Sequence, residues 1–124
     1  MPLQTFEDLD VWKRACRLGV DVAVVFDGFK PWTYQDQITR SSLSIPSNIA
    51  EGSERDSEGD YVRFLNIAKG SCGELRTQLL MAKALQAEKQ KPPIENVDHF
   101  IKETRDISSM LYGLIKSVKA RSAI

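Results

Sequence analysis

The sequence predicts an all-α protein, folded as an up-down-up-down antiparallel four-helix bundle. Apolar residues recur at steps of three and four in four successive segments, the period of an amphipathic helix. Two segments start with Thr or Ser followed three residues later by Asp, as in a capping box. Glycine and proline mark short turns between the segments. We therefore expect helices at about 6–28, 33–52, 58–88 and 94–119 in a single domain covering residues 1–124.

The first segment is apolar on more than one face. Thr5 and Asp8 form its capping box, and Gly28 and Pro31 are expected to end the helix. Its two adjacent apolar rows are Leu9, Trp12, Cys16, Gly19, Ala23 and Phe26, and then Leu18, Val22, Val25 and Phe29. Because helices of an isolated bundle normally expose a polar face, this excess predicts a homo-oligomer.

The second segment combines a short apolar stripe with many small polar residues. Ile38, Ile45 and Ile49 define the stripe, with Leu43 beside it. Pro46 removes a backbone hydrogen bond in mid-helix and is expected to kink it. Gly52 is expected to be the C-cap.

The third and fourth segments have the most regular periods. Their inner rows are expected to be Tyr61, Leu65, Ala68, Cys72, Leu75, Leu79 and Ala82, and Val97, Ile101, Thr104, Ser108, Leu111, Ile115 and Val118. Ser57 and Asp60 form the second capping box. Gly70 and Gly73 each cost about 1 kcal/mol in a helix interior, which predicts close approach of another backbone there.

Composition excludes several classes of protein. No apolar run approaches the roughly 18 residues of a membrane span, and the N-terminus lacks the pattern of a secretory signal. We therefore expect a cytoplasmic protein without a membrane partner.

Cys16 and Cys72 are expected to be reduced core residues. His99 is the only histidine and has no partners at a catalytic or metal-binding spacing. The sequence thus predicts no enzyme, metal or cofactor.

Charge is balanced in total but unevenly distributed, with 17 basic and 17 acidic residues. Five acids lie between positions 51 and 60, whereas all charges after Asp106 are basic. In an antiparallel bundle the start of the first helix meets the end of the fourth. The candidate nucleic-acid patch at that end comprises Lys13, Arg14, Arg17, Lys116, Lys119 and Arg121. The alternative is an ordinary solvated charged face.

Three segments carry a resemblance to a known family. They are Phe6 to Trp12, Gln37 to Gly52, and Phe64 to Ser71 followed by Glu74-Leu75. In this order and spacing the chain resembles the bacterial 23S rRNA intervening-sequence proteins, which are four-helix bundles. The resemblance implies a second helix that continues through Pro46 and no enzymatic activity. It extends to the accessory variability determinant of diversity-generating retroelements, a ring-like pentamer that partners a reverse transcriptase and nucleic acid.

The resemblance draws attention to one motif in the second helix. Its candidate residues are Arg40, Ser44, Pro46, Asn48, Glu51 and Gly52. In one interpretation Ser44 and Asn48 satisfy backbone groups that Pro46 frees, and the motif is structural. In the other, Arg40, Asn48 and Glu51 point into a subunit contact or partner groove.

The function that these observations predict is that of a non-enzymatic oligomer, with a pentamer favoured. It would be an accessory protein associated with RNA or with a reverse transcriptase-type nucleoprotein. The alternative is a protein-only oligomeric scaffold without a nucleic-acid partner.

Overall fold

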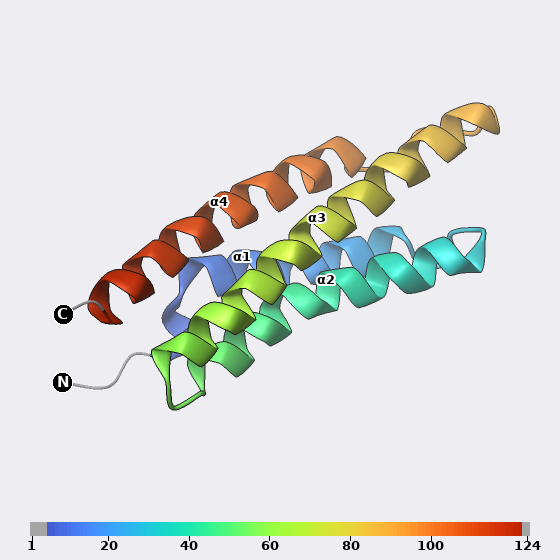
Figure 1. Cartoon of the computed structure of the whole chain (residues 1–124). Coiled ribbons are helices and arrows are strands. Elements are labelled where there is room, and N and C mark those ends of the chain that lie inside the picture. Colours follow the sequence, from blue (N-terminus) through green and yellow to red (C-terminus); the bar gives the residue numbers. More distant parts are fainter. Residues whose placement is uncertain (1–4, 123–124) are drawn as a thin grey trace.

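The computed structural model describes residues 5–122. They form a 3-10 turn, η1 (Phe6–Asp8), and four α-helices. The helices are α1 (Asp10–Val25), α2 (Trp32–Ser53), α3 (Glu58–Glu88) and α4 (Val97–Ser122). Successive helices run in opposite directions, and the start of α1 lies at the same end of the bundle as the end of α4 (Figure 1). The predicted all-α fold is confirmed.

The four helices surround one continuous apolar core. Contacts join α1 to α2, α2 to α3, α3 to α4 and α4 to α1. The predicted inner rows of α3 and α4 are buried apart from Tyr61 and Ser108, which are partly exposed. Ile38, Ile45 and Ile49 are completely buried in α2. Leu43, expected beside that stripe, is instead 58% exposed.

The N-terminal capping box forms, but it caps η1 rather than α1. The Thr5 and Asp8 side chains accept hydrogen bonds from the Glu7 and Thr5 amides, respectively, both at 3.2 Å. Leu9 is extended, with ψ of 124°, and interrupts the expected 6–28 helix. The helix ends at Val25, and Gly28 takes a positive φ of 75° in the following turn.

The fourth helix starts later than expected. Asn96 has φ of 60°, a left-handed conformation that an α-helix excludes, so α4 begins at Val97 rather than at residue 94. Gln90 is also left-handed, with φ of 55°. The connection after α3 therefore folds back over residues 89–96 before the last helix begins.

The inner face of α1 differs from the expected one. Val11, Ala15, Leu18 and Val22 are its buried residues; Leu18 and Val22 come from the second predicted row, and Val11 and Ala15 belong to neither. Phe26 of the first row, just after the helix, is completely buried. In the first row Trp12, Cys16 and Gly19 are partly exposed and Ala23 is exposed. Val20 and Val24 are 52% and 72% exposed. The apolar excess of this helix therefore lies on the outside of the bundle.

Candidate functional site

The motif in α2 faces the Gly70 to Leu75 segment of α3 along a polar seam. The hydroxyls of Ser44 and Ser71 lie 2.8 Å apart, and Ser41 donates to Glu74 Oε1 at 3.0 Å. The Asn48 side-chain amide donates to both the carbonyl and the hydroxyl of Ser44, at 2.8 and 2.9 Å. These hydrogen bonds satisfy polar groups between two packed helices. Ser41 and Ser44 thus join α2 to α3, whereas Asn48 bonds to Ser44 within α2.

The helix continues through Pro46, as the resemblance implied. Proline has no amide hydrogen, so the carbonyl of Ser42 loses its helical donor. Asn48 binds the carbonyl of Ser44 instead, so the prediction that the motif's side chains satisfy the freed group is wrong. The Ser42 carbonyl lies 3.7 Å from the place that a Cβ on Gly19 would occupy. It therefore faces the backbone of α1.

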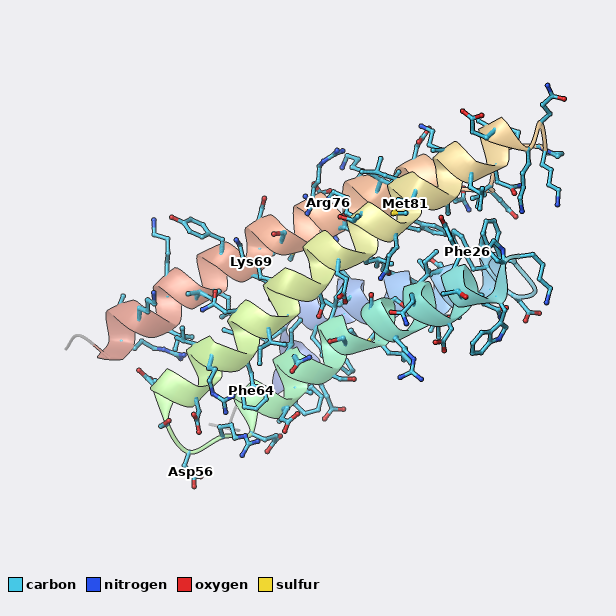
Figure 2. The ribbon with its side chains drawn as sticks, turned by 45° about the vertical axis from the view of Figure 1, so that its right-hand side comes forward. Phe26, Asp56, Phe64, Lys69, Arg76 and Met81 are labelled. Carbon is cyan, nitrogen blue, oxygen red and sulfur yellow. The ribbon has the colours of Figure 1, made fainter. Side chains whose placement is uncertain are left out.

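Gly52 is not the C-cap that the sequence predicted. It lies inside α2, which ends at Ser53 and is capped by Glu54. A Cβ at Gly52 would lie 2.7 Å from the Cβ of Phe64 and 3.2 Å from the carbonyl oxygen of Tyr61. Figure 2 shows Phe64 on the side of α3 that meets α2. The absence of a side chain therefore allows the two helices to approach closely.

The other charged motif residues lie on the surface. Arg40 pairs with Asp36 at 3.1 Å, and Glu51 pairs with Arg55 at 2.9 Å. Each pair joins residues four positions apart, Arg40 and Asp36 within α2 and Glu51 and Arg55 at its C-terminal end. Exposed pairs at this spacing contribute only about 0.3–0.5 kcal/mol to stability. A subunit contact through Arg40 and Glu51 stays a prediction.

The predicted basic patch is partly neutralised by carboxylates. Arg14 donates to Glu103 and also to Asp106, the latter at 3.2 Å. Arg17 pairs with Asp21 at 2.8 Å, in the next turn of α1. The hydrogen bond that Arg14 donates to Glu103 raises the pKa of Arg14 most, and burial opposes it. Arg14 thus holds α1 against α4, and Arg17 stabilises α1 itself.

The C-terminal half of the patch lies elsewhere on the bundle. Arg14 is beside Asp106, which precedes Lys116 by ten residues, about 15 Å along a helix. Arg121 lies 3.8 Å from Glu58 at the start of α3, and Lys119 is exposed, as is Lys13 on α1. The structure therefore leaves the two halves apart. Nucleic-acid binding by this patch stays a prediction.

A groove between α3 and α4 gathers basic residues that the sequence analysis did not select. Its volume is about 390 Å³, and it is lined by Asn66, Lys69, Gly70, Gly73, Arg76 and Ser108. Lys69 and Arg76 lie along the α3 edge (Figure 2). A Cβ at Gly70 or Gly73 would meet no other atom within 4 Å, so the expected close backbone approach is wrong. These glycines leave the groove open instead.

The basic side chains continue along α4. Arg105, Ser108, Tyr112 and Lys116 follow one another at steps of three and four and so share one face of α4. The Lys116 ammonium lies 5.5 Å from the centre of the Tyr112 ring, and Arg76 donates to the Thr104 hydroxyl at 3.0 Å. We call Lys69, Arg76, Arg105 and Lys116, together with Tyr112, the α3–α4 basic face.

The cations of the α3–α4 basic face differ in their surroundings from those of the predicted basic patch. Within residues 5–122, none of the four cations of this face is in an ion pair with a carboxylate. The nearest carboxylates on α4, Glu103 and Asp106, are turned toward Arg14 on α1. Farther toward the α3–α4 turn, Lys83 on α3 pairs with Asp98 on α4 at 2.7 Å. The helical spacing from Arg105 to Lys116 is the sequence feature that could have revealed the α4 half of this face.

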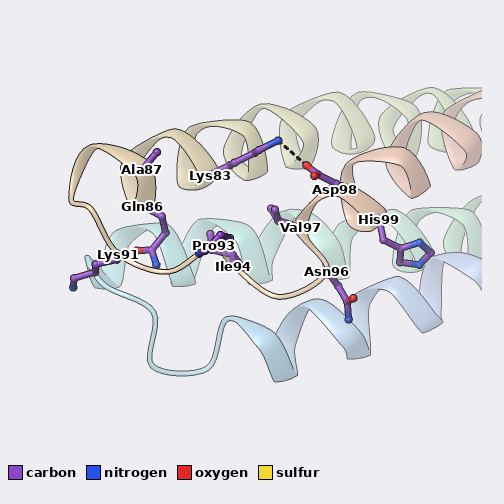
Figure 3. A pocket seen from close by; sticks show the side chains of 10 residues that line it. All are labelled: Lys83, Gln86, Ala87, Lys91, Pro93, Ile94, Asn96, Val97, Asp98 and His99. Atoms are coloured by element: carbon purple, nitrogen blue, oxygen red, sulfur yellow. Dashed lines mark hydrogen bonds and ion pairs between the residues drawn. The ribbon is translucent and has the colours of Figure 1, made fainter.

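A larger hollow lies at the turn between α3 and α4 (Figure 3). Its volume is about 490 Å³, and its lining consists of Lys83, Gln86, Ala87, Lys91, Pro93, Ile94, Asn96, Val97, Asp98 and His99. Asp98 is paired with Lys83, and Gln86 donates to the carbonyl of Pro92 at 3.0 Å. His99 is exposed, as expected, at the edge of this hollow. The polar groups here hold the turn in place.

The remaining reactive groups are unsuited to nucleophilic chemistry. Burial raises the pKa of Cys72 to about 11 and also raises that of the half-buried Cys16. Both thiols are therefore protonated near neutral pH. Among the residues that the structure describes, no group of three or more His, Cys, Asp or Glu side chains could hold a metal ion. The same part of the chain contains no helix long and apolar enough to span a bilayer.

The helix arrangement, the polar α2–α3 seam and the basic groove define a small all-helical protein whose charged groups lie on helix surfaces. The sequence profile of the 23S rRNA-intervening sequence proteins matches residues 7–113. The chain therefore belongs to this family. No curated protein gives a significant sequence match.

Proposed function

We propose that the protein is a non-enzymatic, oligomeric accessory factor that binds RNA or an RNA-containing nucleoprotein in the bacterial cytoplasm. Membership of the 23S rRNA-intervening sequence family supports an association with RNA. The observation that carries the proposal is the α3–α4 basic face, where four cations stand together without carboxylate partners.

Phosphate binding is the function to which such a face is suited. Lysine and arginine side chains gain affinity for nucleic acid by releasing the counterions condensed on phosphates. A net charge of zero does not oppose this, because the charge is unevenly distributed, with five of the 17 acids between positions 51 and 60. The local charge of the face therefore decides the interaction within a Debye length of about 8 Å.

Self-association is the second part of the proposal. Val20 and Val24 on α1 and Leu43 on α2 are each more than half exposed. Exposed apolar residues on adjacent helices favour a contact between copies of the chain, since burying them removes apolar surface from water. The pentamer is the assembly that the resemblance implies.

Multi-angle light scattering at micromolar concentration should give about five times the monomer mass, whereas a monomer mass would contradict self-association.

A protein-only scaffold is the second candidate. The exposed apolar residues of α1 and α2 favour it, because they need no nucleic acid to become buried. The position of the gene also separates the candidates. A location inside a ribosomal RNA intervening sequence or beside a reverse transcriptase supports the RNA-associated function, and an isolated location supports the scaffold.

A mobility-shift titration with a structured RNA tests the proposal directly. If four phosphates are neutralised per subunit, affinity should fall about 50- to 150-fold between 50 and 200 mM salt, depending on whether the contacted phosphates belong to unpaired or paired RNA. Arg105→Glu with Lys116→Glu should weaken binding at least tenfold and flatten the salt dependence. Lys13→Glu with Lys119→Glu changes the net charge equally and serves as the matched control for the end patch. Undetectable binding by the wild-type protein at low salt would leave the scaffold as the function.

A further inference from the structure

We propose that the α3–α4 basic face takes single-stranded RNA, with phosphates along Lys69, Arg76 and Arg105 and an unpaired base stacked on Tyr112. This inference rests on the proposed function and specifies the form of its RNA partner. It follows from the shape of the groove, the arrangement of its cations and the exposure of one aromatic ring.

The floor of the groove is formed by small residues. It runs between two neighbouring helices, whose axes in such packing lie about 8–10 Å apart. Gly70 and Gly73 place only backbone along part of the α3 wall, and Ser108 faces them from α4. A single sugar-phosphate chain can therefore approach the helix backbones. Its phosphates would then lie within reach of Lys69 and Arg76.

The length of the face fits a short strand. Arg105 and Lys116 are eleven residues apart on α4, which corresponds to about 16 Å. At roughly 3.4 Å per stacked nucleotide this spans about five nucleotides. Four cations over this length approach one for each phosphate, so the charge density of the face matches that of a strand.

Tyr112 supplies an exposed aromatic ring on which a base can stack, which a surface of cations alone lacks. Its side chain is 56% exposed, although it lies in the middle of a stable helix beside a completely buried Leu111. Lys116 lies near the ring at 5.5 Å, a distance at which a cation is attracted to the aromatic face. A base can stack on the opposite face of the ring while Lys116 contacts the adjacent phosphate. Basic grooves with interleaved aromatic residues commonly bind single strands in this way.

Double-stranded RNA fits the α3–α4 basic face less well than a single strand does. Its bases are stacked and paired inside, so no base face is available to Tyr112. Its phosphates lie on two strands across a wide surface, whereas Lys69 and Arg76 line a single groove and Arg105 and Lys116 share one face of the adjoining helix α4. We therefore expect discrimination between unpaired and paired RNA, through stacking as well as charge.

The experiment is a fluorescence anisotropy titration with a labelled RNA of about ten nucleotides, either single-stranded or annealed to its complement. The wild-type protein should bind the single strand at least tenfold more tightly than the duplex. Tyr112→Ala should weaken single-strand binding about 5- to 150-fold, the effect of losing one stacked base. Tyr112→Phe keeps the ring and should remain within twofold of wild type. Trp32→Ala removes another exposed aromatic residue, 61% exposed at the start of α2, and should have no effect.

The outcomes separate this inference from the function on which it rests. Equal affinity for both RNAs, or an unchanged affinity of Tyr112→Ala, would overturn single-strand recognition. If Arg105→Glu with Lys116→Glu still weakened binding in that case, the RNA-associated function would stand. Absence of binding to either RNA would overturn both. Circular dichroism of each variant confirms that the helices are retained.

Discussion

At the scale of single residues, two glycines in the signature segments have opposite roles. Gly52 is buried against Phe64 and the backbone of Tyr61, so its missing side chain sets the distance between α2 and α3. Gly70 is exposed and has empty space where a Cβ would stand. The same residue type therefore stabilises packing at one position and leaves a surface open at the other.

Substitution of these glycines should change stability in opposite directions. Gly52→Ala should lower the free energy of unfolding by about 1–3 kcal/mol, because the new Cβ clashes with atoms close to the α3 backbone. Gly70→Ala should raise it by about 0.5–1 kcal/mol, because alanine favours the helix and meets no neighbour. Urea unfolding followed by circular dichroism measures both. A stabilised Gly52→Ala protein would contradict the close approach described for α2 and α3.

Cys72 should report global unfolding. Its thiol is completely buried and has a pKa of about 11, so little thiolate exists at pH 8 in the native protein. In a Cys16→Ser variant, labelling by a disulfide reagent should be slow and should accelerate with urea in parallel with loss of helical signal. Rapid labelling in the absence of urea would place Cys72 outside the core.

The burial of the main apolar rows could be predicted from the sequence because the helical period is regular in α3 and α4. The roles of Gly52 and Gly70 could not be predicted, since propensity alone does not say what lies opposite a glycine. The partners of Arg14 were also missed, because Glu103 and Asp106 are about ninety residues away along the chain. Whether a charge is neutralised depends on such tertiary neighbours.

At the scale of elements, α1 is the shortest of the four helices, and Arg14 holds it to the middle of α4. The hydrogen bond from Lys102 lowers the pKa of Asp106 most, and the one from Arg14 adds to this effect. The native protein therefore keeps this carboxylate charged at a lower pH than the unfolded chain does. The charged Asp106 carboxylate therefore contributes to the stability of the folded protein above the usual aspartate pKa, and this contribution is lost as the pH falls through the native pKa.

Asp106→Asn should remove part of the acid sensitivity of the protein. Between pH 6 and pH 3 the wild type should lose more stability than the variant, and their free energies of unfolding should converge at the acid end. Urea unfolding at several pH values measures this difference, and 0.5 M salt should reduce it because the group is near the surface. Parallel pH profiles for the two proteins would show that the Arg14 and Lys102 contacts do not persist in solution.

The limits of α2 and α3 were predicted closely because Ser57, and the turns around it, give clear local signals. The predicted limits of α1 and α4 were less accurate. Leu9 and Asn96 adopt non-helical backbone conformations. Asparagine tolerates the left-handed region better than most residues, so Asn96 is a local signal for the later start of α4, whereas the sequence offers no such signal at Leu9.

At the scale of the whole molecule, the bundle separates its surfaces by chemistry. The exposed apolar residues of α1 and α2 lie apart from the basic groove between α3 and α4, and many of the acids lie at the α2–α3 turn. The fold class could be predicted from the sequence alone. The groove could not, because it is formed by two stripes that become one surface only when α3 and α4 pack together.

The central claim is that RNA binds along the α3–α4 groove. Titration of a short single-stranded RNA into the isotope-labelled protein, followed by amide chemical shifts, tests it most directly. We expect the largest shifts at Lys69, Gly70, Gly73, Arg76 and Ser108, with little change at Lys13 and Arg17. Shifts confined to α1 and the end of α4, or no shifts at all, would contradict the claim.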